Sequence, residues 1–215
     1  METKLGCILP TYDLLDRLKV LIKQIFDYTS GDFIVYVVEN GQKEETVEWL
    51  KTQNVKLILN EVNKGTSASW NMGMVQALED GCTHFAILSD DTELPPNWWD
   101  ICKKQFENGS HLVSINDGLK HIIFSGWFLV VDKRFLEVVG FFDEQFFFYF
   151  EDLDLSQRLA QSGIKYSIIK LNIIHHDSAT IVGNFKKKKN SFFMKVYRDS
   201  RRKFRAKYPH LKFRM

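Results

Sequence analysis

The sequence predicts an α/β fold in which a mostly parallel central sheet is flanked by helices. In the first half of the chain, apolar runs of strand length alternate with segments of helical periodicity. Such alternation favours parallel strands that are joined by helical crossovers. Hydrophobic residues make up 45% and charged residues 26% of the 215 positions, which is enough apolar material for an ordinary globular core.

Four apolar runs in the first half are the expected strands, at residues 5–9, 33–38, 55–59 and 85–88. The expected helices lie between them, at residues 14–28, 44–52 and 66–79. Gly81 stands just past the last of these helices as a stop signal. This half of the chain therefore reads as consecutive strand–helix units.

The second half is less regular. Strands are expected at residues 112–115 and 122–131, with a turn at residues 116–118 between them. An aromatic stretch at residues 141–150 precedes a helix at residues 153–162, and residues 165–174 supply one or two more strands. Because no linker or repeat interrupts this series, we expect one α/β domain over residues 1–185 and a basic helical tail over residues 186–215.

Net charge and cysteine content indicate the cellular compartment in which the protein is expected. The formal net charge is +2, and the three cysteines, Cys7, Cys82 and Cys102, have no zinc-type spacing. So few cysteines, and an odd number of them, indicate reduced thiols and a cytoplasmic location. The N-terminus has no signal-peptide pattern and no apolar run reaches the roughly 18 residues of a membrane span. We expect a soluble protein.

Polar residues follow three of the expected strands. These segments are Pro10-Thr11-Tyr12, Glu39-Asn40-Gly41 and Ser89-Asp90-Asp91. Ligands of open parallel sheets bind beyond the carboxyl ends of the strands, so the three segments should gather at one edge of the sheet. The topology alone thus predicts a binding site there.

Two groups of acids are candidates for chemistry. Asp90 and Asp91 repel each other unless a cation or water intervenes, and a hard divalent metal would relieve the repulsion and bind a diphosphate. Glu151 and Asp152 follow the apolar run at residues 146–150, where desolvation raises proton affinity and suits a general base. Helix capping and the helix dipole are the structural alternative for both groups.

Two further features contain ligand-type residues. His175 and His176 follow an apolar run, and either would complete a metal site with a carboxylate elsewhere, although most histidines only form structural hydrogen bonds. The segment from Asn63 to Ala68 opens a helix with small residues, and its free N-terminus would favour nucleotide phosphates or ribose. An ordinary capped helix is the alternative for this segment.

These features, in this order, resemble family 2 glycosyltransferases with a GT-A fold, especially the rhamnosyltransferase-like branch. The resemblance covers residues 5–180 and rests on the joint order of several motifs: ILPTYD, VVENG, NKGTSASWNMG, ILSDDTELPPNWW, SGWFLVVDK, VGFFDEQFFFYFEDLDLSQRLAQSG and IIHHDSAT. It implies that residues 1–185 are a GT-A catalytic domain.

The resemblance also implies roles for single residues on the donor side. Pro10, Thr11 and Tyr12 match the nucleobase pocket, and Glu39 and Asn40 fall where the base or ribose is contacted. Asn63, Gly65 and Asn71 match the helix-start motif beside the nucleotide. Asp90 falls among the residues that bind the donor. The metal-binding acid is matched by Asp91, although Ser89 replaces the first acid of the family's DxD motif.

On the acceptor side, Gly126 and Trp127 match the acceptor loop. Asp152 matches the catalytic base, with Glu151 as its neighbour, and His175 or His176 completes the metal site. The implied enzyme is an inverting, Mn²⁺- or Mg²⁺-dependent glycosyltransferase that moves a sugar from a nucleotide-diphosphate sugar to an acceptor hydroxyl.

Other functional classes are weighed against this one. A nucleotidyltransferase would have a glycine-rich, basic loop where Pro10-Thr11-Tyr12-Asp13 stands, which disfavours that class. A non-catalytic nucleotide-sugar-binding module would be expected to have lost the acids, and they are present. The aromatic residues Trp127, Phe147, Phe148 and Tyr149 would stack on a sugar or a base if they do not belong to the core.

The C-terminal segment concentrates positive charge. Residues 186–214 contain thirteen Lys or Arg and a single acid, Asp199, with aromatic residues interleaved. An anionic membrane that holds a lipid-linked acceptor is the favoured partner, which would make the protein peripheral at a membrane surface. Phage-type DNA with hydroxylated bases and a passive solvated helix are the alternatives.

Overall fold

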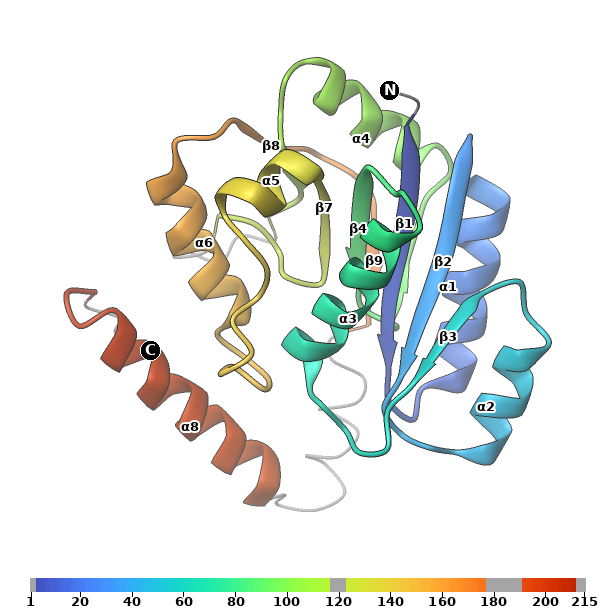
Figure 1. Cartoon of the computed structure of the whole chain (residues 1–215), viewed down its shortest axis with the longest axis horizontal. Coiled ribbons are helices and arrows are strands. Elements are labelled where there is room, and N and C mark those ends of the chain that lie inside the picture. Colours follow the sequence, from blue (N-terminus) through green and yellow to red (C-terminus); the bar gives the residue numbers. More distant parts are fainter. Residues whose placement is uncertain (1–2, 117–122, 177–190, 212–215) are drawn as a thin grey trace.

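A computed structural model describes residues 3–116, 123–176 and 191–211 of the chain (Figure 1). A seven-stranded sheet with the order β3-β2-β1-β4-β7-β6-β8 forms its centre. Strands β1–β4 run parallel, and β7 is antiparallel to both of its neighbours, β4 and β6. A short antiparallel pair, β5 and β9, forms a second sheet. The predicted α/β class with a mostly parallel sheet is confirmed.

The strands of the two sheets have these bounds: β1 Lys4–Thr11, β2 Asp32–Glu39, β3 Lys56–Leu59, β4 His84–Leu88, β5 Thr92–Glu93, β6 Leu112–Ser114, β7 Phe128–Asp132, β8 Tyr166–Ile168 and β9 Ile174–His175. The helices have these: α1 Leu15–Tyr28, α2 Glu44–Lys51, α3 Thr66–Glu79, α4 Trp98–Glu107, α5 Lys133–Val138, α6 Glu151–Ser162 and α8 Ser191–Lys207. Every strand and helix that the first half of the sequence predicts is present within a residue or two.

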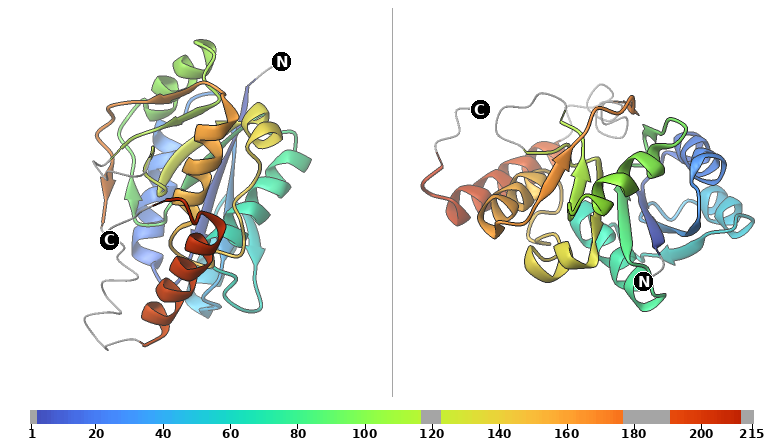
Figure 2. Two further views of the ribbon diagram at one scale, coloured as in Figure 1. Left: turned by 90° about the vertical axis from the view of Figure 1, so that its left-hand side faces the viewer. Right: turned by 90° about the horizontal axis from the view of Figure 1, so that it is seen from above.

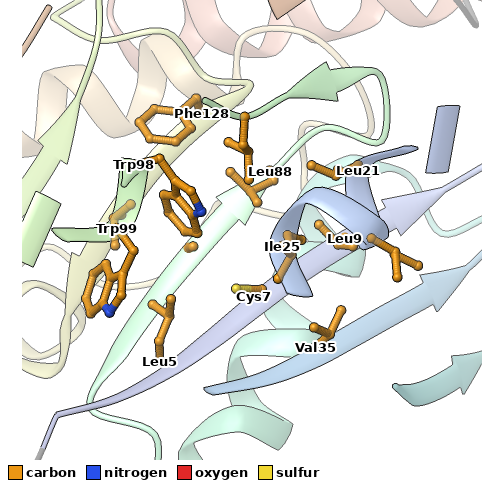
Figure 3. Close-up of a cluster of buried hydrophobic side chains, with 14 of the residues drawn as sticks. Leu5, Cys7, Leu9, Leu21, Ile25, Val35, Leu88, Trp98, Trp99 and Phe128 are labelled. Atoms are coloured by element: carbon orange, nitrogen blue, oxygen red, sulfur yellow. The ribbon is translucent and has the colours of Figure 1, made fainter. Parts of the chain in front are cut away.

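Side chains alternate between the two faces of the sheet, as the strand period of two requires. On one face, Leu5, Cys7 and Leu9 of β1 pack against helices α1 and α4 (Figure 3). Trp98 and Trp99 at the start of α4 are 0% and 2% exposed, so they belong to the core. The other face, with Ile8 of β1, packs against α3, α5 and α6. Figure 2 shows the helices on both sides of the sheet.

The expected strand at residues 122–131 begins later than predicted, at Phe128. A turn precedes it, in which the amide of Ser125 donates to Ile115 O and that of Phe128 donates to Ser125 O. Gly126 lies in this turn, so the apolar run continues through a bend that hydropathy cannot distinguish from a strand. Ile122 and most of the expected turn at residues 116–118 lie outside the described residues.

Helix α8 packs beside α6 on the edge of the molecule farthest from α2 (Figure 1). The buried Phe204 of α8, and Tyr208 directly after the helix, form a third apolar cluster with Phe146, Phe150 and Leu153. Among the residues that the structure describes, no helix has the length and apolar character that a membrane span needs.

Candidate active site

A cavity of about 480 Å³ lies at the carboxyl ends of β1, β2 and β4. The strand ends and the segments after them all reach it, through Thr11 at the end of β1, Asn40 after β2 and Asp91 after β4. The predicted gathering of the three segments at one sheet edge is therefore confirmed. The other sequence-predicted site residues that line the cavity are Pro10, Tyr12, Asn63, Gly65, Asp90, Gly126, Trp127, Glu151, Asp152 and His175.

Asp91 and His175 form the polar centre of one wall. Strand pairing of β5 with β9 sets Thr92 opposite His175 and thereby brings the imidazole to the carboxylate. His175 Nε2 lies 3.2 Å from Asp91 Oδ1, and both side chains are largely buried. Ser89 donates to the same Asp91 oxygen at 2.5 Å. Trp127 stacks on the imidazole with ring centroids 4.4 Å apart and an interplanar angle of 7°, which fixes the ring's orientation.

This pair fits a divalent cation. Neighbouring ligands of an octahedral ion, at about 2.1 Å from the metal, lie about 3 Å apart, close to the observed separation of 3.2 Å. Within residues 3–116, 123–176 and 191–211, no group of three or more His, Cys, Asp or Glu side chains is arranged as a metal site. Two protein ligands would leave room for oxygens of a bound diphosphate and for water.

Asp90 points back toward the first strand. Its Oδ2 accepts a hydrogen bond from the Thr11 hydroxyl at 2.8 Å and from the Tyr12 amide at 3.4 Å. Burial, and to a lesser degree the neighbouring Asp91, raise the pKa of Asp90 to about 7, against the opposing effect of the two donors. Asp90 thus ties the two strand-end segments together at the cavity wall.

Glu151 and Asp152 begin helix α6 on the other side of the cavity. Tyr149 and Phe150, which precede them, have φ angles of 65° and 74°, a left-handed conformation that costs energy in non-glycine residues. Burial, and then the adjacent Asp152 carboxylate, raise the pKa of Glu151 to about 8. Its buried Oε2 has no hydrogen-bond partner among the described residues. Strain and an unpaired buried polar atom together are typical of functional sites.

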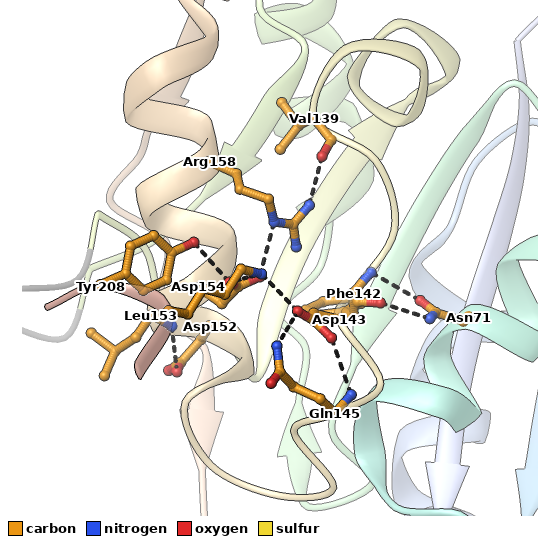
Figure 4. A network of polar contacts seen from close by, with 11 residues as sticks. Asn71, Val139, Phe142, Asp143, Gln145, Asp152, Leu153, Asp154, Arg158 and Tyr208 are labelled. Atoms are coloured by element: carbon orange, nitrogen blue, oxygen red, sulfur yellow. Dashed lines mark hydrogen bonds and ion pairs between the residues drawn. The ribbon is translucent and has the colours of Figure 1, made fainter. Parts of the chain in front are cut away.

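Asp152 is placed by the backbone around it. Its Oδ1 accepts from the Leu153 amide at 2.7 Å (Figure 4). A Cβ atom at Gly126 would lie 2.7 Å from Asp152 Cβ, so only glycine allows the turn before β7 to approach this closely. The acceptor-loop glycine of the sequence analysis therefore shapes the position of the predicted base.

The start of helix α3 is occupied by the aromatic segment, contrary to the expectation of a free, anion-binding end. The Thr66 amide donates to Phe147 O at 2.9 Å, and the Ser67 hydroxyl donates to Phe146 O at 2.7 Å. Gly65 has a φ of 81°, and a Cβ there would lie 2.4 Å from Phe147 O. Asn63 accepts from the Gly65 amide at 2.8 Å. This motif holds the cavity wall in place.

Three sequence-predicted site residues do not line the cavity. The Glu39 carboxylate accepts from the amides of Gly41 and Gln42 at 2.8 and 2.7 Å and so folds the turn after β2. Asn71 pairs with both backbone groups of Phe142 (Figure 4). It also donates to the Glu144 carboxylate at 2.9 Å. His176 contacts Glu93 at 2.5 Å and Arg17 at 3.1 Å. These three side chains position the segments around the site.

Several residues of the cavity wall are not predicted from the sequence. Trp70 of α3 is 4% exposed and lies against Phe142, with ring centroids 4.9 Å apart. Phe192, Phe193 and Val196 come from α8, within the segment that the sequence predicts to be a tail. The interleaving of aromatic residues with basic ones was the available signal, because an amphipathic helix with an aromatic face needs a surface to cover.

Helix α8 is tied to α6 by polar contacts as well as packing. Tyr208 donates to the fully buried Asp154 at 2.8 Å, and Arg158 donates to the same carboxylate at 2.9 Å (Figure 4). Lys207 lies 2.6 Å from both Asp143 and Asp154. Nearer the N-terminal end of the helix, the Ser200 hydroxyl donates to Phe148 O at 2.9 Å. The described part of the basic segment therefore supports the aromatic wall of the cavity.

A mostly parallel sheet with helices on both faces, and with acids and an imidazole around a cavity at its strand ends, defines the GT-A class of fold. Comparison with solved structures agrees. The mannosyltransferase PcManGT from Pyrobaculum calidifontis, solved with GDP-Man and Mn²⁺, matches with a TM-score of 0.62 at 17% identity over 80% of this chain and 56% of that chain.

Two other solved structures give the same result. S. aureus TarS 1–349 matches with a TM-score of 0.64 at 15% identity over 78% of this chain and 58% of that chain. GalNAc-T7, solved with UDP, GalNAc and Mn²⁺, matches with a TM-score of 0.63 at 12% identity over 80% of this chain and 45% of that chain. The chain spans about half the length of these solved chains.

The family is shown by sequence. The model of glycosyl transferase family 2 matches residues 7–159, and the chain belongs to this family. A search of curated proteins gave no significant match.

Proposed function

We propose that this protein is an inverting glycosyltransferase that moves a sugar from a nucleotide-diphosphate sugar to an acceptor hydroxyl. One observation supports the proposal above all others. The Asp91–His175 pair, with Nε2 and Oδ1 3.2 Å apart, and the acids Glu151 and Asp152 line the same cavity although they lie far apart in the sequence. A cation site and a base in one cavity are what sugar transfer from a diphosphate requires.

The donor would bind at the strand ends. Pro10, Thr11, Tyr12 and Asn40 line the part of the cavity next to β1 and β2, where the nucleoside would lie. Asp91 and His175 would hold Mn²⁺ or Mg²⁺, and a bound divalent ion supplies positive charge beside the diphosphate. Three related structures support this donor class, since PcManGT was solved with GDP-Man, GalNAc-T7 with UDP and TarS 1–349 with UDP.

The transfer step would be a direct displacement. The acceptor hydroxyl oxygen attacks the anomeric carbon from the face opposite the diphosphate, its proton passes to the Asp152 carboxylate, and the bond to the diphosphate breaks. Burial, and then the adjacent Asp152, raise the pKa of Glu151 to about 8, which favours its protonated form. Asp152 is therefore the proposed proton acceptor of the two.

The acceptor would enter beside the aromatic wall. Gly126 and Trp127 border the cavity on the side of Asp152, and Phe147, Phe148 and Tyr149 line it between α3 and α6. These rings are half-buried, and therefore offer apolar faces to a sugar ring or a lipid-linked acceptor. We favour a glycan or lipid-linked acceptor, in the manner of the rhamnosyltransferase-like branch. Hydroxylated bases of DNA are the alternative acceptor.

The test of the base is Asp152→Asn. We expect turnover to fall by about 100- to 10,000-fold, the usual contribution of general-base catalysis, while donor affinity stays within about twofold. Asp16→Asn, at an exposed position on α1, is the matched control and should keep full activity. Normal turnover in Asp152→Asn would remove Asp152 from the role, and donor binding without any turnover in the wild type would favour a non-catalytic binding module.

The donor is identified first, by thermal stabilisation with a panel of UDP, GDP and dTDP sugars in the presence of Mn²⁺. A ligand that binds only the folded state raises the melting temperature. Product analysis with the stabilising donor then tests inversion, because direct displacement must give the opposite anomeric configuration.

A further inference from the structure

Helix α8 presents a stripe of basic side chains to solvent. Lys195, Arg198, Arg202 and Arg205 are exposed and follow one another at intervals of three, four and three residues. At 3.6 residues per turn, this spacing places all four on one face of the helix. The opposite face carries Ser200 and Phe204, which are buried against the rest of the molecule, as is Tyr208 directly after the helix.

The charge on this stripe is largely uncompensated. Asp199, the only acid of α8, pairs with Lys203 and Arg202 at 2.6 and 2.7 Å. Within the described parts of the chain, no carboxylate lies at ion-pair distance from Lys195, Arg198 or Arg205. The sequence adds four lysines, 186–189, directly before the helix. A concentrated positive field of this kind attracts an anionic surface.

Two large apolar side chains are exposed at the first turn of the same helix. Phe192 is 50% exposed and Met194 is 39% exposed, although Phe192 also lines the cavity. Apolar side chains next to cations are the composition of helices that lie in a membrane interface. The remaining exposed side chains of α8 in the described region are Lys, Arg and Ala, with no amide or hydroxyl group.

We propose that the outer face of α8 docks on an anionic lipid surface. The basic stripe would lie over the lipid phosphates, and Phe192 and Met194 would enter the interface beside the mouth of the cavity. A bilayer fits this face better than duplex DNA. Entry of Phe192 and Met194 into the acyl boundary lowers the free energy by removing them from water, whereas the phosphate backbone of a duplex offers them no apolar surface. The inner face of α8 is already packed, so the helix stays attached to the protein when it docks.

Sedimentation with vesicles tests this inference, and it needs neither donor nor acceptor. The full chain is mixed with vesicles of phosphatidylcholine alone or with 30% phosphatidylglycerol, at low and high salt. We expect binding to the anionic vesicles only, and weaker binding as salt rises. Equal sedimentation with both vesicle types, or none with either, would overturn the proposal.

The stripe is tested by the triple variant K195Q/R198Q/R205Q. Each basic side chain near an anionic surface strengthens binding about fivefold, so the variant should bind the anionic vesicles on the order of 100-fold more weakly. The matched control, K51Q/K104Q/R134Q, removes three exposed charges from α2, α4 and α5 and should bind like the wild type. An equal loss in both variants would show a net-charge effect and contradict a docking face.

Met194→Ser provides a second, charge-neutral test on the same helix. We expect a fewfold loss of vesicle binding with an unchanged salt dependence, since only the apolar contact is removed. Unaltered melting temperatures of this variant and of the triple variant exclude unfolding as the cause. If the triple variant unfolds, its three single substitutions are measured instead. Duplex DNA serves as the competitor: if the protein binds DNA more tightly than anionic vesicles, the lipid assignment is wrong.

Discussion

At the scale of single residues, Glu151 links the site to the stability of the fold. Burial and the Asp152 carboxylate raise its pKa from 4.5 to about 8. Between these two pH values the folded protein keeps a proton that the unfolded chain has lost. Unfolding therefore releases a proton in this range, so the free energy of unfolding falls as the pH rises from about 5 to about 8 and levels off above it.

Glu151→Gln should remove this contribution. We expect the variant to be more stable than the wild type at pH 8, with the difference shrinking toward pH 5, in urea denaturation at a series of pH values. Glu107→Gln, at an exposed position on α4, is the control and should leave the pH profile unchanged. Parallel profiles for the wild type and Glu151→Gln would show that this carboxyl group is not protonated in the folded state.

Gly65 is a residue whose backbone and contacts both exclude a side chain. Its φ is 81°, and a Cβ would lie 2.4 Å from the carbonyl oxygen of Phe147. Gly31 has a similar φ of 84°, but its Cβ position is open. Comparing the two substitutions by alanine separates the cost of the contact from the cost of the left-handed backbone.

We expect Gly65→Ala to lower the free energy of unfolding by at least about 1 kcal/mol more than Gly31→Ala does, because overpacking against a fixed carbonyl adds to the backbone strain. Chemical denaturation of the two variants provides the comparison. Equal losses would mean that the aromatic segment moves away from α3 at little cost, and that the wall it forms is not rigid.

At the scale of elements, α8 is a support for the site as well as a charged surface. Its Phe204 is 1% exposed among Phe146 and Phe150, the residues that flank the rings of the cavity wall. Phe192 on the same helix is 50% exposed. The sequence places both in one basic segment, and only the packing distinguishes the core residue from the surface one.

Phe204→Ala should therefore cost about 3–5 kcal/mol of stability, the range for deletion of a buried aromatic ring, while Phe192→Ala should cost less than about 1 kcal/mol. Thermal or urea unfolding measures both. A small loss in Phe204→Ala would show that α8 contributes little to the fold and behaves as an independent tail.

The elements of the first half could be predicted because their periodicity is local and strong. The pattern at residues 66–79, closed by Gly81, predicts α3 with its observed bounds. The late start of β7 and the pair of β5 with β9 could not be predicted, since they depend on hydrogen bonds between segments distant in the chain. Tertiary packing sets where β7 begins and which strand pairs with β5, and the local composition of these segments does not indicate either.

At the scale of the whole molecule, parallel topology explains why much of the site could be predicted. Residues after β1, β2 and β4 must meet at one edge, and Thr11, Asn40 and Asp91 do so. The motif order of the resemblance pointed to Asp152 and His175, which also line the cavity. Glu39 and His176 were predicted as contacts but bond to neighbouring protein groups, because adjacent strand and turn residues point in different directions.

The central claim is that Asp91 and His175 hold a divalent ion against the diphosphate of the donor, in the same cavity as Asp152. Titration calorimetry of the donor nucleotide diphosphate, with Mn²⁺ and with EDTA, tests it most directly in the wild type, Asp91→Asn, His175→Ala and Asp152→Asn. We expect Mn²⁺ to tighten binding at least tenfold in the wild type and in Asp152→Asn, but not in the other two variants. The same affinity with Mn²⁺ and with EDTA in the wild type would contradict the account.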